Sequence, residues 1–244
     1  MNEEKNSLNA VEADANAVLP DLEDASRISW LTENLLKDPL KVISTFGRIS
    51  TFSLLLNIIL VNIVCLLAYG VIVGSFSGGI QWYMSPAKII TGLLLTILFC
   101  YPSFYIFICL SGIDVKPGRA FLILASSVSV FSILIVGFAP IAWVFSQSTS
   151  TVFFIGFFHL VFWFISTVFG MRVLIKMVSS LKCRNMSYPL FWILIFMITS
   201  LQMMTALRPM VGTADTILPK EKMFFMYNWG KLFSETVDVD GPRR

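Results

Sequence analysis

Long apolar runs separated by short polar stretches dominate the middle of the chain. A run of about twenty apolar residues is long enough for a helix to cross the hydrocarbon core of a bilayer. The polar connections between the runs are too short to hold a domain. We therefore predict an all-α fold, a polytopic membrane helical bundle within 49–212, with five transmembrane helices at roughly 49–74, 88–111, 119–145, 151–178 and 189–207.

The chain before the first span falls into two parts. Residues 1–25 are acidic, lack aromatic residues and show no periodicity, which predicts a disordered acidic N-terminal tail. Residues 26–48 are expected to form an interfacial amphipathic helix and a linker, because apolar residues recur with helical spacing until Pro39. Two positions for this helix stay open: at the lipid headgroups, as Trp30 suggests, or packed beneath the bundle. Its apolar stripe consists of Ile28, Leu31, Leu35 and Leu36.

Residues 213–244, after the last span, are expected to form an exposed C-terminal tail. Within this tail, residues 219–233 interleave aromatic residues with lysines, a pattern typical of a segment at the membrane interface. No internal repeat is visible along the chain, so the inverted-repeat architecture of many secondary transporters is not supported.

Composition supports a membrane protein and argues against one class of partner. The chain is 56% hydrophobic and 14% charged, with a mean hydropathy of +0.78. Soluble domains carry about 25% charged residues. The net charge of +3 is small, and the charged residues lie at segment borders instead of in one basic patch. We therefore expect no nucleic-acid partner, because such binding needs an electrostatic footprint.

The distribution of lysine and arginine predicts the orientation in the membrane. With the N-terminus inside, the inner flanks of the five spans carry eight of these residues and the outer flanks carry four. The flank with more positive charge faces the cytoplasm. The prediction is thus an N-terminus in the cytoplasm and a C-terminus outside.

The spans carry few groups that could do chemistry. They contain no aspartate or glutamate, which proton-coupled and sodium-coupled carriers generally need. The motifs of intramembrane aspartyl, zinc and rhomboid-like proteases are missing. We therefore expect no catalytic residues, no metal and no cofactor, and interpret the chain as a non-enzyme.

Candidate polar side chains within the first and fourth spans include Asn57, Asn62 and His159. His159 is the only histidine, and it could serve as a proton relay or as a ligand. It has no acidic partner nearby in the sequence, which favours a hydrogen bond to a neighbouring helix instead. Asn57 and Asn62 lie about 140° apart around the first span. Single amides inside a bundle generally fasten helices together, although substrate coordination is an alternative.

Small residues and prolines predict how the helices pack. Gly70 and Gly74 form a GxxxG pair, and the third span carries serines at positions 126, 129 and 132. Both patterns allow helices to approach closely, either within this chain or with a partner subunit. Pro102 and Pro140 interrupt the second and third spans and are expected to kink them. Such kinks line a pathway in channels and are features of shape in simpler bundles.

Further candidates lie near the ends of the last two spans. Arg172 and Lys176 share one face of the fourth span, where they can reach anionic headgroups or a cytosolic partner. Gln202 lies inside the fifth span and needs a partner on another helix. Pro209 disfavours helical geometry at Arg208, so this pair is interpreted as the point where the helix leaves the membrane.

Three stretches together resemble a known group of proteins. They are "YPSFYIFICLSG" (101–112), "GFAPIAWVFSQS" (137–148) and "LQMMTALRPMVG" (201–212). This combination resembles a little-characterised group of bacterial multi-pass inner-membrane proteins that is loosely similar to the Yip-domain family. The resemblance covers roughly 95–215 and implies a five-span bacterial inner-membrane protein without an assigned activity. Met210 stands where an aromatic residue would be more usual.

Two functions therefore compete. The first is a non-enzymatic anchor, scaffold or accessory subunit of a membrane assembly, with the lipid bilayer and a protein partner or second copy as its contacts. The alternative is a transport or channel component that uses the proline-kinked spans and Gln202. A third class, an enzyme acting on lipid or peptide, would need His159 close to Tyr105 or to a serine of the third span.

Overall fold

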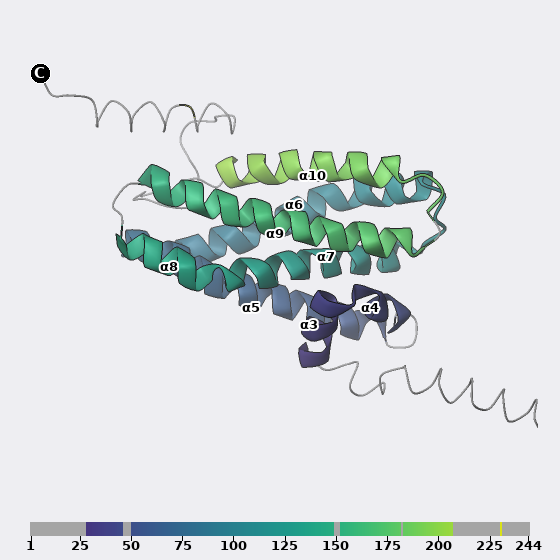
Figure 1. Ribbon diagram of the computed structural model, residues 1–244, viewed down its shortest axis with the longest axis horizontal. Coiled ribbons are helices and arrows are strands. Elements are labelled where there is room, and N and C mark those ends of the chain that lie inside the picture. The colour runs from purple at the N-terminus through teal and green to yellow at the C-terminus, as the bar shows by residue number, and fades with distance from the viewer. Residues whose placement is uncertain (1–27, 46–49, 149–151, 182, 207–229, 231–244) are drawn as a thin grey trace, which may run out of the picture.

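The computed structural model describes residues 28–45, 50–148, 152–181, 183–206 and 230. These parts of the chain are helical, and the helices are joined by short connections (Figure 1). The predicted tails at 1–25 and 213–244 lie outside the described residues, except for residue 230. The helices are α3 (Ile28–Lys37), α4 (Pro39–Thr45), α5 (Thr51–Ser77), α6 (Gln81–Leu110), α7 (Pro117–Gly137), α8 (Ala139–Ser148), α9 (Val152–Ser179) and α10 (Ser187–Ala206).

The all-α prediction is confirmed. Among the described residues, five helices are long and apolar enough to cross a membrane: α5, α6, α7, α9 and α10. Each coincides with one predicted span. Two bounds differ clearly: α6 begins at Gln81 instead of residue 88 and therefore contains Lys88, and α7 ends at Gly137 instead of residue 145.

The two prolines of the kink prediction behave differently. The third predicted span divides into α7 and α8 around Phe138, and Pro140 is the second residue of α8. Proline has no backbone N–H, so at the start of a new helix it leaves no hydrogen bond unmade. Pro102, by contrast, lies inside α6, which continues past it as one helix to Leu110. The second span is therefore not divided at this proline.

The exposed side of the bundle is apolar, as a lipid environment requires. On α5, the side chains of Leu56, Leu60, Val64 and Leu67 are each about half exposed and repeat with helical spacing. In water such a stripe would need a covering partner, whereas lipid tails solvate it directly. Together with the lengths of the five helices, this surface gives the chain the character of a multi-pass membrane protein.

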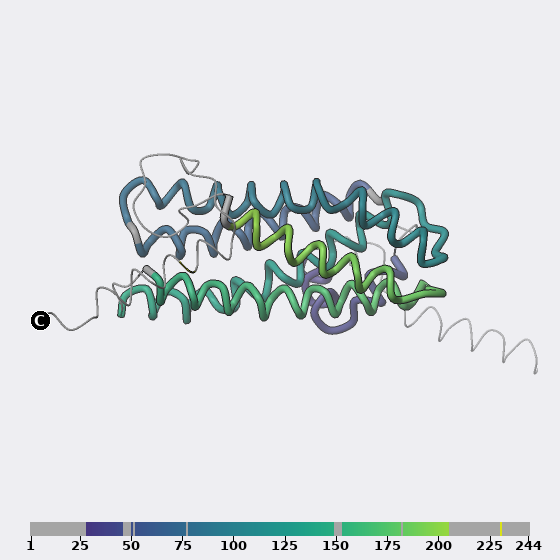
Figure 2. Tube along the Cα trace, turned by 90° about the horizontal axis from the view of Figure 1, so that it is seen from above, coloured from purple at the N-terminus to yellow at the C-terminus, as the bar shows by residue number. Residues whose placement is uncertain are grey.

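One helix lies at the centre of the bundle. Every side chain of α7 from Leu122 to Ser132 is buried. α7 packs against α5 and α9, while α6 packs against α5 and α10. Figure 2 shows blue α5 and α6 running side by side, with green α9 on the other side of the bundle and α10 running obliquely in this view. Polar side chains on α7 are thereby directed at neighbouring helices.

The connections after α6 and before α10, on the right of Figure 1, are hydrogen-bonded to each other. The carbonyl oxygen of Ser111, after α6, accepts hydrogen bonds from the backbone N–H groups of Arg184 (3.0 Å) and Asn185 (3.3 Å), before α10. At the opposite end, α5 turns into α6 through Gly78 and Gly79, whose φ angles of 67° and 56° favour glycine. These connections fix the order of the helices at both ends.

The amphipathic segment packs beneath the bundle, which decides between the two positions left open. Leu31 and Leu35 of α3 are 1% and 0% exposed and belong to the same apolar core as α5, α6 and α7. The following residues form a second helix, α4, whose Val42 and Ile43 join that core; a linker was predicted there. The apolar face of α3 is thus covered by protein.

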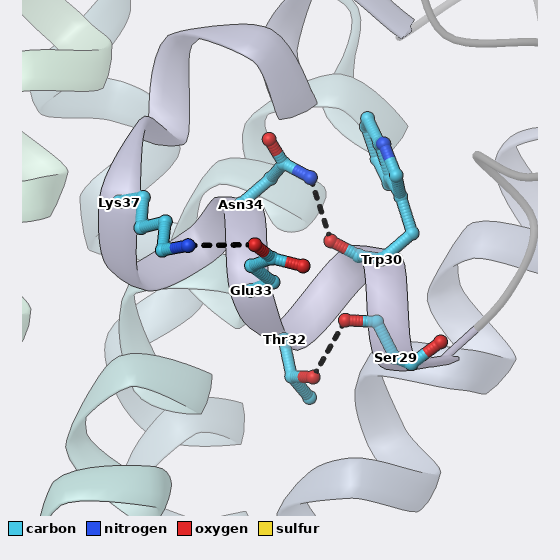
Figure 3. A network of polar contacts seen from close by, with 6 residues as sticks. All are labelled: Ser29, Trp30, Thr32, Glu33, Asn34 and Lys37. Atoms are coloured by element: carbon cyan, nitrogen blue, oxygen red, sulfur yellow. Dashed lines mark hydrogen bonds and ion pairs between the residues drawn. The ribbon is translucent and has the colours of Figure 1, made fainter.

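The opposite face of α3 is polar and bonds locally (Figure 3). Asn34 Nδ2 donates to the Trp30 carbonyl at 2.9 Å, and Lys37 Nζ contacts Glu33 Oε1 at 2.7 Å. The hydrogen bond and the positive charge of Lys37 lower the pKa of the Glu33 carboxyl below its ordinary value. Two of the four residues in the predicted apolar stripe, Leu31 and Leu35, are buried. The other two, Ile28 (41% exposed) and Leu36 (47% exposed), lie outside the buried face.

Candidate functional site

Asn62 fastens α5 to the central helix. Its Nδ2 donates to Ser129 Oγ at 2.9 Å and to the Ile58 carbonyl at 2.9 Å, and its Oδ1 accepts from Ser132 Oγ at 2.7 Å. Both donors of the amide and one acceptor position are thus in use. Two of the three serines predicted to allow close packing provide these bonds, and the third, Ser126, has a buried hydroxyl without a hydrogen-bond partner among the described residues.

His159 pairs with Tyr69 across α5 and α9. The Tyr69 hydroxyl and His159 Nδ1 are 2.6 Å apart, and the two rings meet edge to face with centroids 5.6 Å apart. Tyr69 is 4% exposed. The histidine therefore has the hydrogen bond to a neighbouring helix that the sequence favoured. Tyr105 lies near the end of α6 that leads to α7, whereas His159 lies near the opposite end of the bundle.

The glycine pair of the first span packs within the chain. A Cβ added at Gly70 would lie 2.4 Å from Pro86 Cα, and one at Gly74 would lie 2.5 Å from the Gln81 carbonyl oxygen. These positions let α5 and α6 touch backbone to backbone, so the GxxxG face is not left for a partner subunit. A second close approach, between Gly170 of α9 and α7, was not anticipated; a Cβ there would lie 2.9 Å from a backbone oxygen of α7.

Trp192 is a further anchor that sequence reasoning missed. It is 0% exposed on α10, and its Nε1 donates to Ser103 Oγ (3.0 Å) and to the Cys100 carbonyl (3.2 Å) of α6. Its ring packs against Phe104 with centroids 4.5 Å apart. The one signal for this site was a tryptophan inside an apolar span, because a buried indole N–H generally finds an acceptor.

A polar stripe lines the buried face of α6 near its start. Gln81, Ser85, Lys88 and Thr96 are all buried, and Lys88 is 3% exposed. Ser85 Oγ donates to Gln81 Oε1 at 3.3 Å. In the orientation count, Lys88 is one of the four residues on the outer flanks, but the structure places it within α6 on a buried face. An ionisable side chain inside a spanning helix marks a candidate functional site.

The remaining charged side chains gather at one end of the bundle. Among the described residues, every cation except Lys88 lies toward the end that holds α3 and α4. Lys176 Nζ lies 3.7 Å from Asp38 Oδ1, so one cation of the predicted pair meets the chain's own α3–α4 segment. Arg172 is exposed, and its guanidinium carbon lies 5.6 Å from the centroid of the Phe169 ring.

The remaining candidate residues from the sequence lie on different helices or outside the described residues. Asn57 and Gln202 are half-buried on α5 and α10. Arg208 and Pro209, predicted to end the last span, lie outside the described residues. Among the residues that the structure describes, no group of three or more histidine, cysteine, aspartate or glutamate side chains could hold a metal ion.

Comparison with known proteins returned no relative. No protein-family model matches the chain, and neither the curated proteins nor the solved structures contain a significant match.

Proposed function

We propose that this chain is a non-enzymatic integral membrane protein that acts as an anchor, scaffold or accessory subunit of a membrane assembly. The observation that carries the proposal is how polar groups inside the bundle are used. Asn62, the Tyr69–His159 pair and Trp192 all form hydrogen bonds from one helix to another. Polar groups committed in this way stabilise one arrangement of helices and leave fewer groups for chemistry on a substrate.

The proposed location is a bacterial inner membrane, with the N-terminus in the cytoplasm and the C-terminus outside. The clustering of lysine and arginine at the α3–α4 end supports this orientation, because positive flanks remain on the cytoplasmic side. The large apolar surface of α5 supports contact with lipid. A protein partner or a second copy of the chain would contact the remaining surface.

The orientation can be tested with two exposed serines. In a variant lacking the native cysteines, Ser148→Cys at the end of α8 should react with a membrane-impermeant maleimide in intact cells. Ser44→Cys in α4 should react only after the membrane is permeabilised. Equal labelling of both positions in intact cells would contradict the proposed orientation.

The scaffold role can be tested by recovering the full-length protein from native membranes in mild detergent after brief crosslinking. The expected result is a stoichiometric partner or a homo-oligomer, seen by mass measurement of the intact complex. A monodisperse monomer that crosslinks to nothing would count decisively against this role. An unrelated five-span protein expressed at the same level controls for non-specific capture.

The buried stripe of α6 favours a second candidate, a transport or channel component. Burying Lys88 in a spanning helix is costly, and such residues often line ion or solute pathways. Liposomes containing the purified protein should then conduct an ion or solute, and Lys88→Met and Gln202→Ala should each change the rate. Ser148→Ala, at the exposed end of α8, is the matched control. Absence of flux across a panel of ions and small solutes would remove this candidate.

A further inference from the structure

Two cations lie one turn apart on an exposed flank of α9. Arg172 and Lys176 are both exposed, and their i, i+4 spacing places them on the same face of the helix. The same face continues away from the cations as an apolar stripe of Phe169, which is 48% exposed, and the half-buried Ile165 and Val161. We propose that this flank binds an anionic phospholipid, with the phosphate between the two cations and an acyl chain along the apolar stripe.

The position of Arg172 fits the depth of a lipid phosphate. Its guanidinium lies over the ring of Phe169, at 5.6 Å from the ring centroid, so it stays on the lipid-facing flank. Arg172 precedes the end of α9 at Ser179 by about 10 Å, given the rise of an α-helix. At that depth, the guanidinium is stabilised when the phosphate of a lipid headgroup lies beside it. A phosphate also accepts two parallel hydrogen bonds from arginine.

The carboxylate of Asp38, next to Lys176, reduces the positive charge of the site. Lys176 Nζ lies 3.7 Å from Asp38 Oδ1, and the two side chains are 51% and 41% exposed. An ammonium group has three donors, so contact with one carboxylate oxygen leaves others for a phosphate. By formal charge, the two cations and one carboxylate give the site a net charge of +1. That charge matches the single negative charge of a phosphatidylglycerol headgroup better than a zwitterionic headgroup.

The shape of the site favours a lipid over a soluble protein. A cytosolic partner would meet the end of the bundle, where the connections containing Lys116 and Arg184 are exposed. Arg172 and Lys176 instead lie on the side of a spanning helix, in line with side chains that face lipid tails. The inference rests on α9 crossing a bilayer, and it does not depend on the scaffold role.

The test is native mass spectrometry of the full-length protein in detergent, titrated with phosphatidylglycerol or with phosphatidylcholine of the same acyl chains. The wild-type protein should retain phosphatidylglycerol preferentially. Each basic residue near a membrane surface contributes about a fivefold change in binding, so Arg172→Gln with Lys176→Gln should weaken phosphatidylglycerol binding roughly thirtyfold. Asp38→Asn should strengthen it.

A matched control separates a local site from total charge. Lys116→Gln with Arg184→Gln removes the same charge from the same end of the bundle but outside the proposed site, and it should weaken binding much less than the α9 variant does. The inference is overturned if this control weakens binding as much as the α9 variant, if the α9 variant binds like the wild type, or if the wild type binds both lipids equally. If the double variant does not fold, the two single variants give the same decision, each with a loss of about fivefold.

Discussion

The contact between α5 and α6 at Gly70 is a sensitive point in the fold. We predict that Gly70→Ala destabilises the bundle, although alanine is the better helix former. The added Cβ would lie 2.4 Å from Pro86 Cα and 3.0 Å from both the nitrogen and the Cβ of Pro86. The nearest obstacle is a backbone atom, so no change of side-chain rotamer relieves the overlap. The two helices would have to move apart.

The size of the effect follows from these distances. Carbon atoms in favourable contact lie about 3.5–4.0 Å apart, so the helices must separate locally by about 1 Å or more. Overpacking of this kind costs about 1–3 kcal/mol, and the upper end applies where backbone must shift. Alanine returns up to about 1 kcal/mol over glycine through its helix propensity. We expect a net loss of about 2 kcal/mol, or roughly 4–8 °C in Tm for a chain of this length.

Thermal unfolding in one detergent, followed by circular dichroism and by the solubility of the heated protein, measures this loss. Gly137→Ala is the matched control, because a Cβ at Gly137 at the end of α7 meets nothing within 4 Å. The control should stay within about 1 °C of the wild-type Tm or above it. If Gly70→Ala is as stable as the wild type, or if both variants lose equally, the close approach of α5 and α6 is not what the structure indicates.

Three further substitutions test the interhelical hydrogen bonds by the same unfolding measurement. Trp192→Phe keeps an aromatic ring but removes the N–H that reaches Ser103 Oγ and part of the buried indole, so it should cost at least about 1–2 kcal/mol; no loss would mean that this bond does not form. Tyr69→Phe removes the hydroxyl bonded to His159 and should cost about 1 kcal/mol, a loss that disappears when His159 is already alanine if the two groups interact. Asn62→Leu should cost about 1–2 kcal/mol, and an unchanged or raised Tm would refute its role as a fastener.

The number and approximate limits of the spanning helices could be predicted because bilayer thickness fixes them. A run of about twenty apolar residues is visible without knowledge of any neighbour. A break near Pro140 could also be predicted, since a proline inside a helix removes a backbone hydrogen bond, and the chain divides into α7 and α8 just before this residue. α6 continues past Pro102 as one helix, and the kink expected there stays a prediction.

Which face of each span points inward could not be predicted. Lipid tails are as apolar as a protein core, so leucine and phenylalanine surround each spanning helix with little periodicity. The burial of Lys88 and the bonds of Trp192 to α6 therefore depend on which helix lies beside which, and only the packed bundle decides that. Gly70 and Gly74 showed that a close approach would occur without showing that α6 would make it.

The α3 segment shows most clearly what the sequence determines and what only the tertiary structure decides. Its sequence determined an amphipathic helix, because Leu31 and Leu35 must avoid water. A lipid surface and a protein surface satisfy that requirement equally, so the pattern left two positions open. The tertiary structure decided between them, because the ends of the spanning helices present an apolar surface that Leu31 and Leu35 cover. Hydrophobicity specifies that a face is removed from water, and only the packing of the whole chain specifies what covers it.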